Sequence, residues 1–103
     1  MSWTRVCKLS DIAEESALQV EVEGDPVCIA RSGGEVFAVD DICSHAEVSL
    51  SEGDVEDGRV ECWLHGSRFD LRTGKATSLP ATEPIAVFPV KVEGDEVLVD
   101  VEP

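Results

Sequence analysis

The sequence predicts an all-β fold, a sandwich or barrel built from short antiparallel strands. Two observations predict it. Short runs in which apolar and polar residues alternate recur along the chain, and turns that contain glycine separate them. No stretch sustains a helical period over several turns. The chain has 103 residues, so we expect residues 1–103 to form one domain.

The first part of the chain predicts a series of hairpins. Gly24-Asp25 and Gly33-Gly34 are typical of tight turns between antiparallel strands. A turn-like piece is expected at 9–12, and the stretch 13–18 gives only a weak helical signal. The strands expected around these turns are 3–7, 18–22, 27–30 and 36–39.

The remainder divides into a loop-rich part and a second hairpin. Alternation weakens between residues 40 and 78, where glycines punctuate the chain and only short strands are expected, at 60–63 and 68–71. Asp57-Gly58 and Thr73-Gly74 have the composition of turns. Alternation returns at 85–92 and 96–101 on either side of a turn at 93–95. We therefore expect residues 40–78 to be a subdomain inserted into the β framework.

Both histidines of the chain lie beside cysteines in this subdomain. Cys43 and His45 form a C-x-H pair, Cys62 and His65 form a C-x-x-H pair, and sixteen residues separate the two pairs. Each pair is close enough in sequence to reach one metal centre from a single loop. Two thiolates and two imidazoles suit either tetrahedral zinc or an iron–sulfur cluster.

The other two cysteines have no such neighbours. Cys7 and Cys28 lie on expected strands, far in sequence from either histidine. We interpret them as buried, small apolar residues without a ligand role. Trp63, between two of the candidate ligands, is expected to pack against and shield the site.

The spacing of the two pairs, followed by Gly66 and Ser67, resembles the binding signature of the Rieske family. The surrounding residues resemble it too: 39–42 run into the first pair, 69–74 follow the second, and the segment 79–84 resembles that family's proline-containing cluster loop. The resemblance covers residues 3–101. It implies a Rieske-like antiparallel sandwich or barrel in which the inserted subdomain at about 40–78 binds the cluster.

The resemblance also implies the cofactor and its ligands. One [2Fe–2S] cluster would be bound by Cys43, His45, Cys62 and His65, with thiolates on one iron and imidazoles on the other. With two neutral imidazoles in place of two thiolates, such a cluster is easier to reduce than an all-cysteine one. We expect both histidines to lie at an exposed tip and to form the route for electrons.

The residues around the ligands imply a low reduction potential within the family. Members from respiratory and photosynthetic complexes carry disulfide-bonded cysteines where this chain has Val48 and Leu64, and a tyrosine where it has Phe69. Without these groups a reduced cluster is less stabilised, whereas the hydroxyl of Ser67 favours reduction. We therefore expect a reduction potential in the low part of the family's range of roughly −150 to +300 mV.

Charge limits the classes of partner. Eight Lys and Arg against 22 Asp and Glu give a formal net charge of −14, so nucleic acid and anionic membranes would be repelled. The acidic surface either attracts proteins with basic docking faces or simply keeps the chain in solution. The sequence shows no signal-peptide pattern and no long apolar run, so we expect a cytoplasmic protein. We also expect it to be a monomer.

Within the family, the chain most resembles the stand-alone ferredoxins of multicomponent ring-hydroxylating dioxygenases. This implies a one-electron carrier, not an enzyme, between a flavin-dependent reductase and a terminal non-haem iron oxygenase. The alternative is an accessory redox subunit linked to iron–sulfur cluster assembly or to a nitrite-reductase-type enzyme. A structural zinc module, a third possibility, would be colourless and would not take up an electron.

Overall fold

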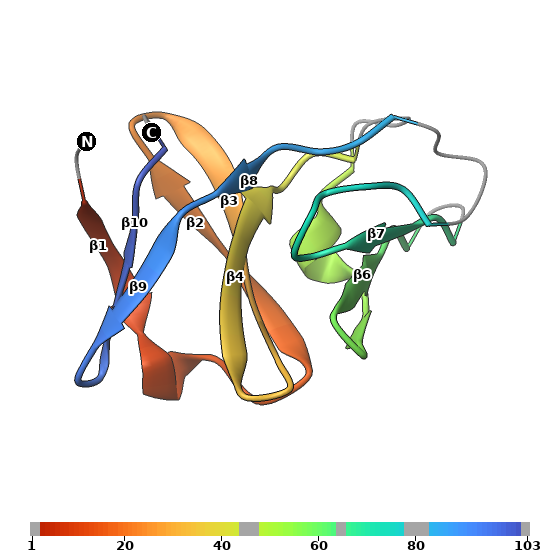
Figure 1. Ribbon diagram of the computed structural model, residues 1–103. Helices are drawn as coiled ribbons and strands as arrows, with labels where there is room; N and C mark the ends of the chain where they lie inside the picture. The colour runs from red at the N-terminus through yellow and green to blue at the C-terminus, as the bar shows by residue number, and fades with distance from the viewer. Residues whose placement is uncertain (1–2, 44–47, 64–65, 78–82, 102–103) are drawn as a thin grey trace.

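The computed structural model describes residues 3–43, 48–63, 66–77 and 83–101, and in these the chain is almost entirely strand, turn and loop (Figure 1). No α-helix occurs among them, and none of the described helical segments could cross a membrane. Two short 3₁₀ turns are present, η1 (Leu9–Asp11) and η2 (Leu50–Glu52). The strands are β1 (Thr4–Lys8), β2 (Ser16–Val22), β3 (Asp25–Ser32), β4 (Glu35–Asp40), β5 (Val55–Glu56), β6 (Arg59–Glu61), β7 (Arg68–Asp70), β8 (Val87–Phe88), β9 (Val90–Glu93) and β10 (Glu96–Val99).

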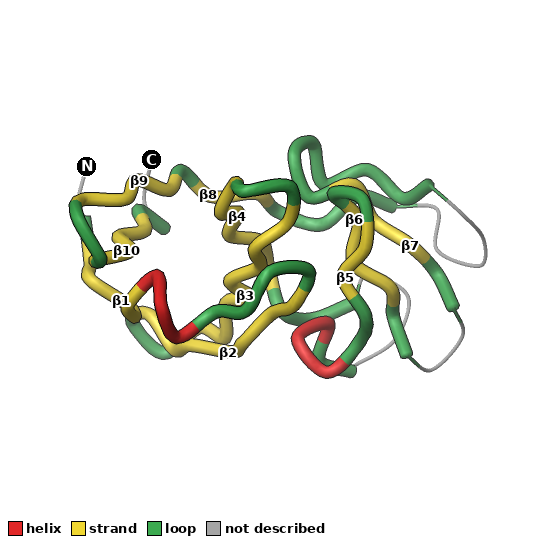
Figure 2. The backbone as a smooth tube through the Cα atoms, turned by 90° about the horizontal axis from the view of Figure 1, so that it is seen from below, coloured by secondary structure: helices red, strands yellow, loops and turns green. Residues whose placement is uncertain are grey.

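Two antiparallel sheets form the larger part of the molecule. One has the order β1-β10-β9 and the other β2-β3-β4-β8, so the two ends of the chain pair in the first sheet. Viewed along the strands, the two sheets curve around one interior, as in a barrel (Figure 2). That interior is the first core, which contains Ile12, Val22, Val27, Ile29, Ala38, Val97 and Val99.

The third sheet, β5-β6-β7, lies beside this barrel, on the side of β2-β3-β4-β8 (Figures 1 and 2). It packs a second core against the outer face of the β2-β3-β4-β8 sheet. Cys28, Ala30 and Val39 belong to that second core, whereas Val27, Ile29 and Ala38 belong to the first. Because side chains alternate across a strand, β3 is buried on both faces, and its continuous run Val27–Ala30 follows from that position.

The expected all-β antiparallel fold is confirmed, and most strand positions agree within a few residues. Three details were wrong. The expected strand at 85–92 is divided by Pro89, which has no N–H to donate, into β8 and β9 in different sheets. The stretch 13–18, which gave the weak helical signal, contains a turn at 14–15 and the first three residues of β2, and the expected strand 60–63 ends at Glu61.

Candidate functional site

Each of the two cysteines in the C/H pairs begins a short loop that is closed at its neck. The Cys43 N–H donates to the Val48 carbonyl at 3.1 Å, and a bridge joins Ile42 to Ser49 just outside that contact. The Cys62 N–H donates to the Ser67 carbonyl at 2.6 Å. In both loops the cysteine N–H bonds the carbonyl five residues further on, so two unlike sequence motifs share one way of closing their loops.

The neck of the second loop is the end of a hairpin. β6 and β7 pair in register up to Glu61 and Arg68, whose side chains approach to 3.7 Å, and the loop begins at the next residue. Inside the loop, Gly66 has φ +74° and donates its N–H to the Cys62 carbonyl at 2.9 Å. Glycine adopts this left-handed backbone without strain, which allows the chain to turn back so sharply.

A third neck closes the segment that contains the proline loop. The Ile85 N–H donates to the Gly74 carbonyl at 2.8 Å. Gly74 has φ +79°, and a Cβ at this position would lie 2.2 Å from the Ile85 carbonyl oxygen. Only glycine allows both this backbone conformation and this close approach of the two segments.

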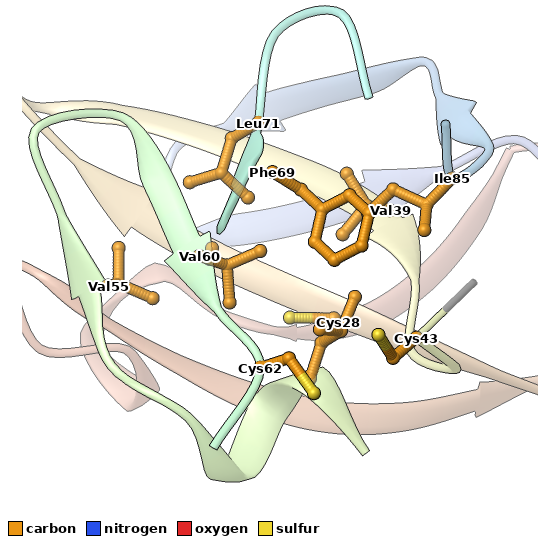
Figure 3. Close-up of a cluster of buried hydrophobic side chains, with 11 residues drawn as sticks. Cys28, Val39, Cys43, Val55, Val60, Cys62, Phe69, Leu71 and Ile85 are labelled. Carbon is orange, nitrogen blue, oxygen red and sulfur yellow. The ribbon is translucent and has the colours of Figure 1, made fainter. Parts of the chain in front are cut away.

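The two loops bring their cysteines into one core. Cys43 and Cys62 are buried, at 3% and 0% exposure, and both thiols are free of disulfide bonds. Both belong to the second core together with Phe69, which is completely buried and lies over the cysteines in Figure 3. Val55, Val60, Leu71 and Ile85 complete much of the surrounding apolar wall.

Cys28 also lies in this core but differs from the other two cysteines. It comes from the middle of β3 rather than from a loop, and its side chain is completely buried. Burial raises the pKa of its thiol far above the usual value, and the nearby charge of Asp41 raises it further. This shift favours the protonated thiol, whereas a metal ligand must be a thiolate. The interpretation of Cys28 as a buried, apolar-like residue therefore agrees with its surroundings.

Cys7 is in a different part of the molecule. It lies on β1 at an irregularity in the pairing with β10, packed beside the first core and only partly buried. Burial and the charge of Asp11 raise the pKa of its thiol. Cys7 is therefore separated by the barrel from the two loop cysteines.

The donor groups present fit the cofactor that the sequence implies. Two buried thiols face one apolar core from two loops, which is the arrangement by which one iron of a Rieske cluster takes two cysteine ligands. His45 and His65 lie outside the described residues, as do Leu64 and most of the segment 79–84. Within the described part of the chain, no group of three or more Cys, His, Asp or Glu is placed to bind a metal ion.

The outer face of the third sheet is charged. Opposite charges face each other across its strands, Glu56 beside Arg59 and Arg59 beside Asp70. Asp54, Asp57 and Glu61 add further carboxylates around a shallow hollow on this face. The acidic stretch between the two cysteine loops is thus a solvated surface next to the site, with more acidic than basic groups.

Sequence reasoning missed two features of the site. Trp63, which was expected to pack against and shield the site, is about half exposed, at 52%. Asp41 went unrecognised although it is completely buried two residues before Cys43. Gly53 was treated only as a loop residue, yet it touches the backbone of Glu61, next to Cys62.

Known proteins resemble this chain over almost its whole length. The biphenyl 2,3-dioxygenase ferredoxin component of Rhodococcus jostii (strain RHA1) is 49% identical over 102 residues, covering 99% of this chain and 95% of the relative. The ferredoxin of carbazole 1,9a-dioxygenase from Nocardioides aromaticivorans IC177 superposes with a TM-score of 0.89 at 38% identity, covering 96% of this chain and 97% of that one. A chain from the complex of reduced oxygenase and oxidized ferredoxin in carbazole 1,9a-dioxygenase matches with a TM-score of 0.88 at 38% identity, covering 94% of this chain and 91% of that one.

The family model for the Rieske [2Fe–2S] domain matches residues 2–89, which include β1, the sheets β2-β3-β4-β8 and β5-β6-β7, and both cysteine loops. The Rieske-like fold, the two closed loops with buried thiols and the similarity to dioxygenase ferredoxins agree with this match. This chain belongs to the Rieske [2Fe–2S] domain family and carries the [2Fe–2S] cluster that defines it.

Proposed function

We propose that this chain is the electron-transferring ferredoxin component of a ring-hydroxylating oxygenase system. It would take one electron at a time from a flavin-dependent reductase and deliver it to a terminal non-haem iron oxygenase. The observation that carries this proposal is the pair of buried thiols that two separate, closed loops place in one core. The relatives at 38–49% identity are ferredoxin components of dioxygenases, which supports the same role.

We further propose Cys43, His45, Cys62 and His65 as the ligands and residues 40–78 as the cluster-binding subdomain. When bound there, the cluster supplies reversible one-electron transfer. The loop necks fix the positions of the two cysteine thiolates, and Phe69 and the surrounding apolar residues exclude water from their side. These residues make no bond to any organic substrate in this role, so the chain is a carrier and not an enzyme.

The partners are proposed to dock through basic faces. The net charge of −14 and the acidic outer face of β5-β6-β7 support this, because opposite potentials accelerate encounter. The electron-transfer rate to the oxygenase should then fall steeply as salt rises. We propose that the carrier itself is a monomer, which sedimentation of the cluster-loaded protein tests directly.

The ligand set is tested by analysis of iron and sulfide together with spectroscopy. The purified protein should be red-brown, contain two irons and two acid-labile sulfides, and bleach with dithionite. Alanine at any of the four ligand positions should abolish the Rieske signal in electron paramagnetic resonance. Cys28→Ala is the matched control, since it removes a thiol from the same core and should leave the signal unchanged. A colourless protein that contains zinc would refute the proposal.

The carrier role is tested by reconstitution. A ring-hydroxylating oxygenase and its reductase should turn over with this protein and not with the Cys62→Ala variant. Equal turnover without any ferredoxin would refute the role as donor. Electron delivery to a nitrite-reductase-type enzyme and not to the oxygenase would instead support the accessory-subunit alternative.

A further inference from the structure

The neck of the first cysteine loop contains a buried carboxylate. Asp41 is 0% exposed and lies two residues before Cys43. A carboxylate is seldom buried in a small domain, because its desolvation is costly unless hydrogen bonds compensate for it. The contacts of Asp41 show what holds it there.

Both carboxylate oxygens of Asp41 accept hydrogen bonds from different parts of the molecule. The Ser51 N–H, in η2, donates to Oδ1 at 2.8 Å. The side-chain amide of Gln19, in β2, donates to Oδ2 at 2.5 Å. The carboxylate therefore ties the segment that follows the first cysteine loop to a strand of the barrel.

The backbone of Asp41 joins the same two parts. Its carbonyl accepts from the Leu50 N–H at 2.6 Å, and its N–H donates to the Pro26 carbonyl at 3.3 Å, in β3. The Ile42–Ser49 bridge and the Cys43–Val48 bond continue the ladder toward the loop. One residue thus anchors both ends of the first loop to the barrel, which suits a group that must hold a ligand in place.

The charge of Asp41 has a second consequence. These hydrogen bonds do not require an anion, because an asparagine side chain offers one acceptor and one donor, and the Gln19 amide can turn to accept from it. A negative charge in the low-dielectric interior acts on its surroundings more strongly than one in water. Adding an electron nearby is opposed by that charge.

Resting on the proposed function, we infer that Asp41 is the positioning residue of the first ligand loop and that its buried charge lowers the reduction potential of the site formed at Cys43 and Cys62. The two parts of the role are separable. Asp41→Asn keeps the hydrogen bonds and removes the charge, whereas Gln19→Leu keeps the charge and removes the bond to β2.

The test uses cluster-loaded protein, with the midpoint potential and the rate of iron release to a chelator as readouts. For Asp41→Asn we expect an unchanged electron paramagnetic resonance signal and a reduction equilibrium about tenfold more favourable, a rise of about 59 mV for one electron. For Gln19→Leu we expect severalfold faster iron release and no rise in potential. Asp100→Asn is the control, because Asp100 is equally buried but follows β10 in the barrel.

Three outcomes would overturn the inference. They are an Asp41→Asn potential equal to that of the parent or of Asp100→Asn, loss of the cluster from a folded Asp41→Asn protein, and parental iron release from Gln19→Leu. Should Asp41→Asn fail to fold, the Gln19→Leu release rate decides the positioning role alone. A parent protein without a Rieske signal would refute the proposed function, whereas a normal parent with unshifted variants refutes only the inference about Asp41.

Discussion

Gly53 is the residue at which a single added carbon should loosen the site most directly. Its φ of −92° is open to any residue, so alanine brings no backbone strain. A Cβ there would instead lie 1.7 Å from the carbonyl oxygen of Glu61 and 3.0 Å from its carbonyl carbon. An ordinary contact needs about twice the shorter distance. The segment 53–54 must therefore move away from β6, which is followed immediately by Cys62.

The cost of Gly53→Ala follows from that movement. Overpacking of a rigid interior costs about 1–3 kcal/mol. Displacing the Glu61 N–H from the Asp54 carbonyl, a 2.8 Å bond, adds about 0.5–1.5 kcal/mol. The sum of roughly 1.5–4.5 kcal/mol is a large fraction of a small domain's stability and should lower the unfolding midpoint by about 6 °C or more.

The assay compares thermal unfolding with the rate of iron release from cluster-loaded protein. Gly94→Ala is the matched control, because Gly94 has φ +65° but open space where a Cβ would stand. Its cost of about 1–2 kcal/mol comes from backbone strain in the C-terminal hairpin, remote from the site. Only Gly53→Ala should also accelerate iron release. An unfolding midpoint within 2 °C of the parent, or equal release from both variants, would refute this reasoning.

Three further substitutions test other parts of the structure. Phe69→Tyr places a hydroxyl in a fully buried position of the cysteine core, so it should raise the midpoint potential and lower the free energy of unfolding by about 1–3 kcal/mol. A midpoint potential that stays level or falls in voltammetry would contradict this. In the folded protein the pKa of the Cys28 thiol is raised, whereas in the unfolded chain the thiol ionises above pH about 9. Its contribution to the free energy of unfolding is therefore unchanged below that pH, and it falls by up to about 1.4 kcal/mol per pH unit above it. Cys28→Ala should flatten that alkaline slope in thermal unfolding, and an unchanged slope would exclude the thiol as its source. Arg72 pairs with Glu35 at 2.9 Å and lies over the Phe37 ring, but it is largely exposed, so Arg72→Ala should cost only about 1 kcal/mol, less at high salt. A loss above about 2 kcal/mol would show that this contact is a principal link between β4 and the segment that follows β7.

The sequence predicted the framework well because its signals are local. A hairpin is specified by alternation and a glycine turn within about ten residues, and the cysteine loops by Cys/His pairs two or three residues apart. β5 has only two residues, too few for alternation to show, and it exists because β6 pairs with it. Pro89 did carry a local signal, the missing N–H, which should have divided the last long strand.

Tertiary features of the site had no local signal. Asp40 and Asp41 are adjacent and chemically identical, yet Asp40 is half-buried and bonds the Ile42 N–H, whereas Asp41 is fully buried between β2 and η2. Which of the two turns inward depends on Gln19 and Ser51, 22 and 10 residues away. Trp63 was expected to pack because it lies between two candidate ligands, but it is about half exposed, and its neighbour Cys62 occupies the inward position at the end of the hairpin.

The alternation of β3 explains how a small domain can vary its redox site without losing its fold. Val27 and Ile29 face the barrel core, while Cys28 and Ala30 face the core that contains both loop cysteines. Because successive side chains point to opposite faces, a change at one position alters one core and leaves the other face of the sheet intact. The β2-β3-β4-β8 sheet of the barrel thus packs against the site, and Asp41 connects that sheet to the first loop through its hydrogen bonds. The environment of the sulfur atoms, and with it the reduction potential, can therefore change through the site-facing residues alone.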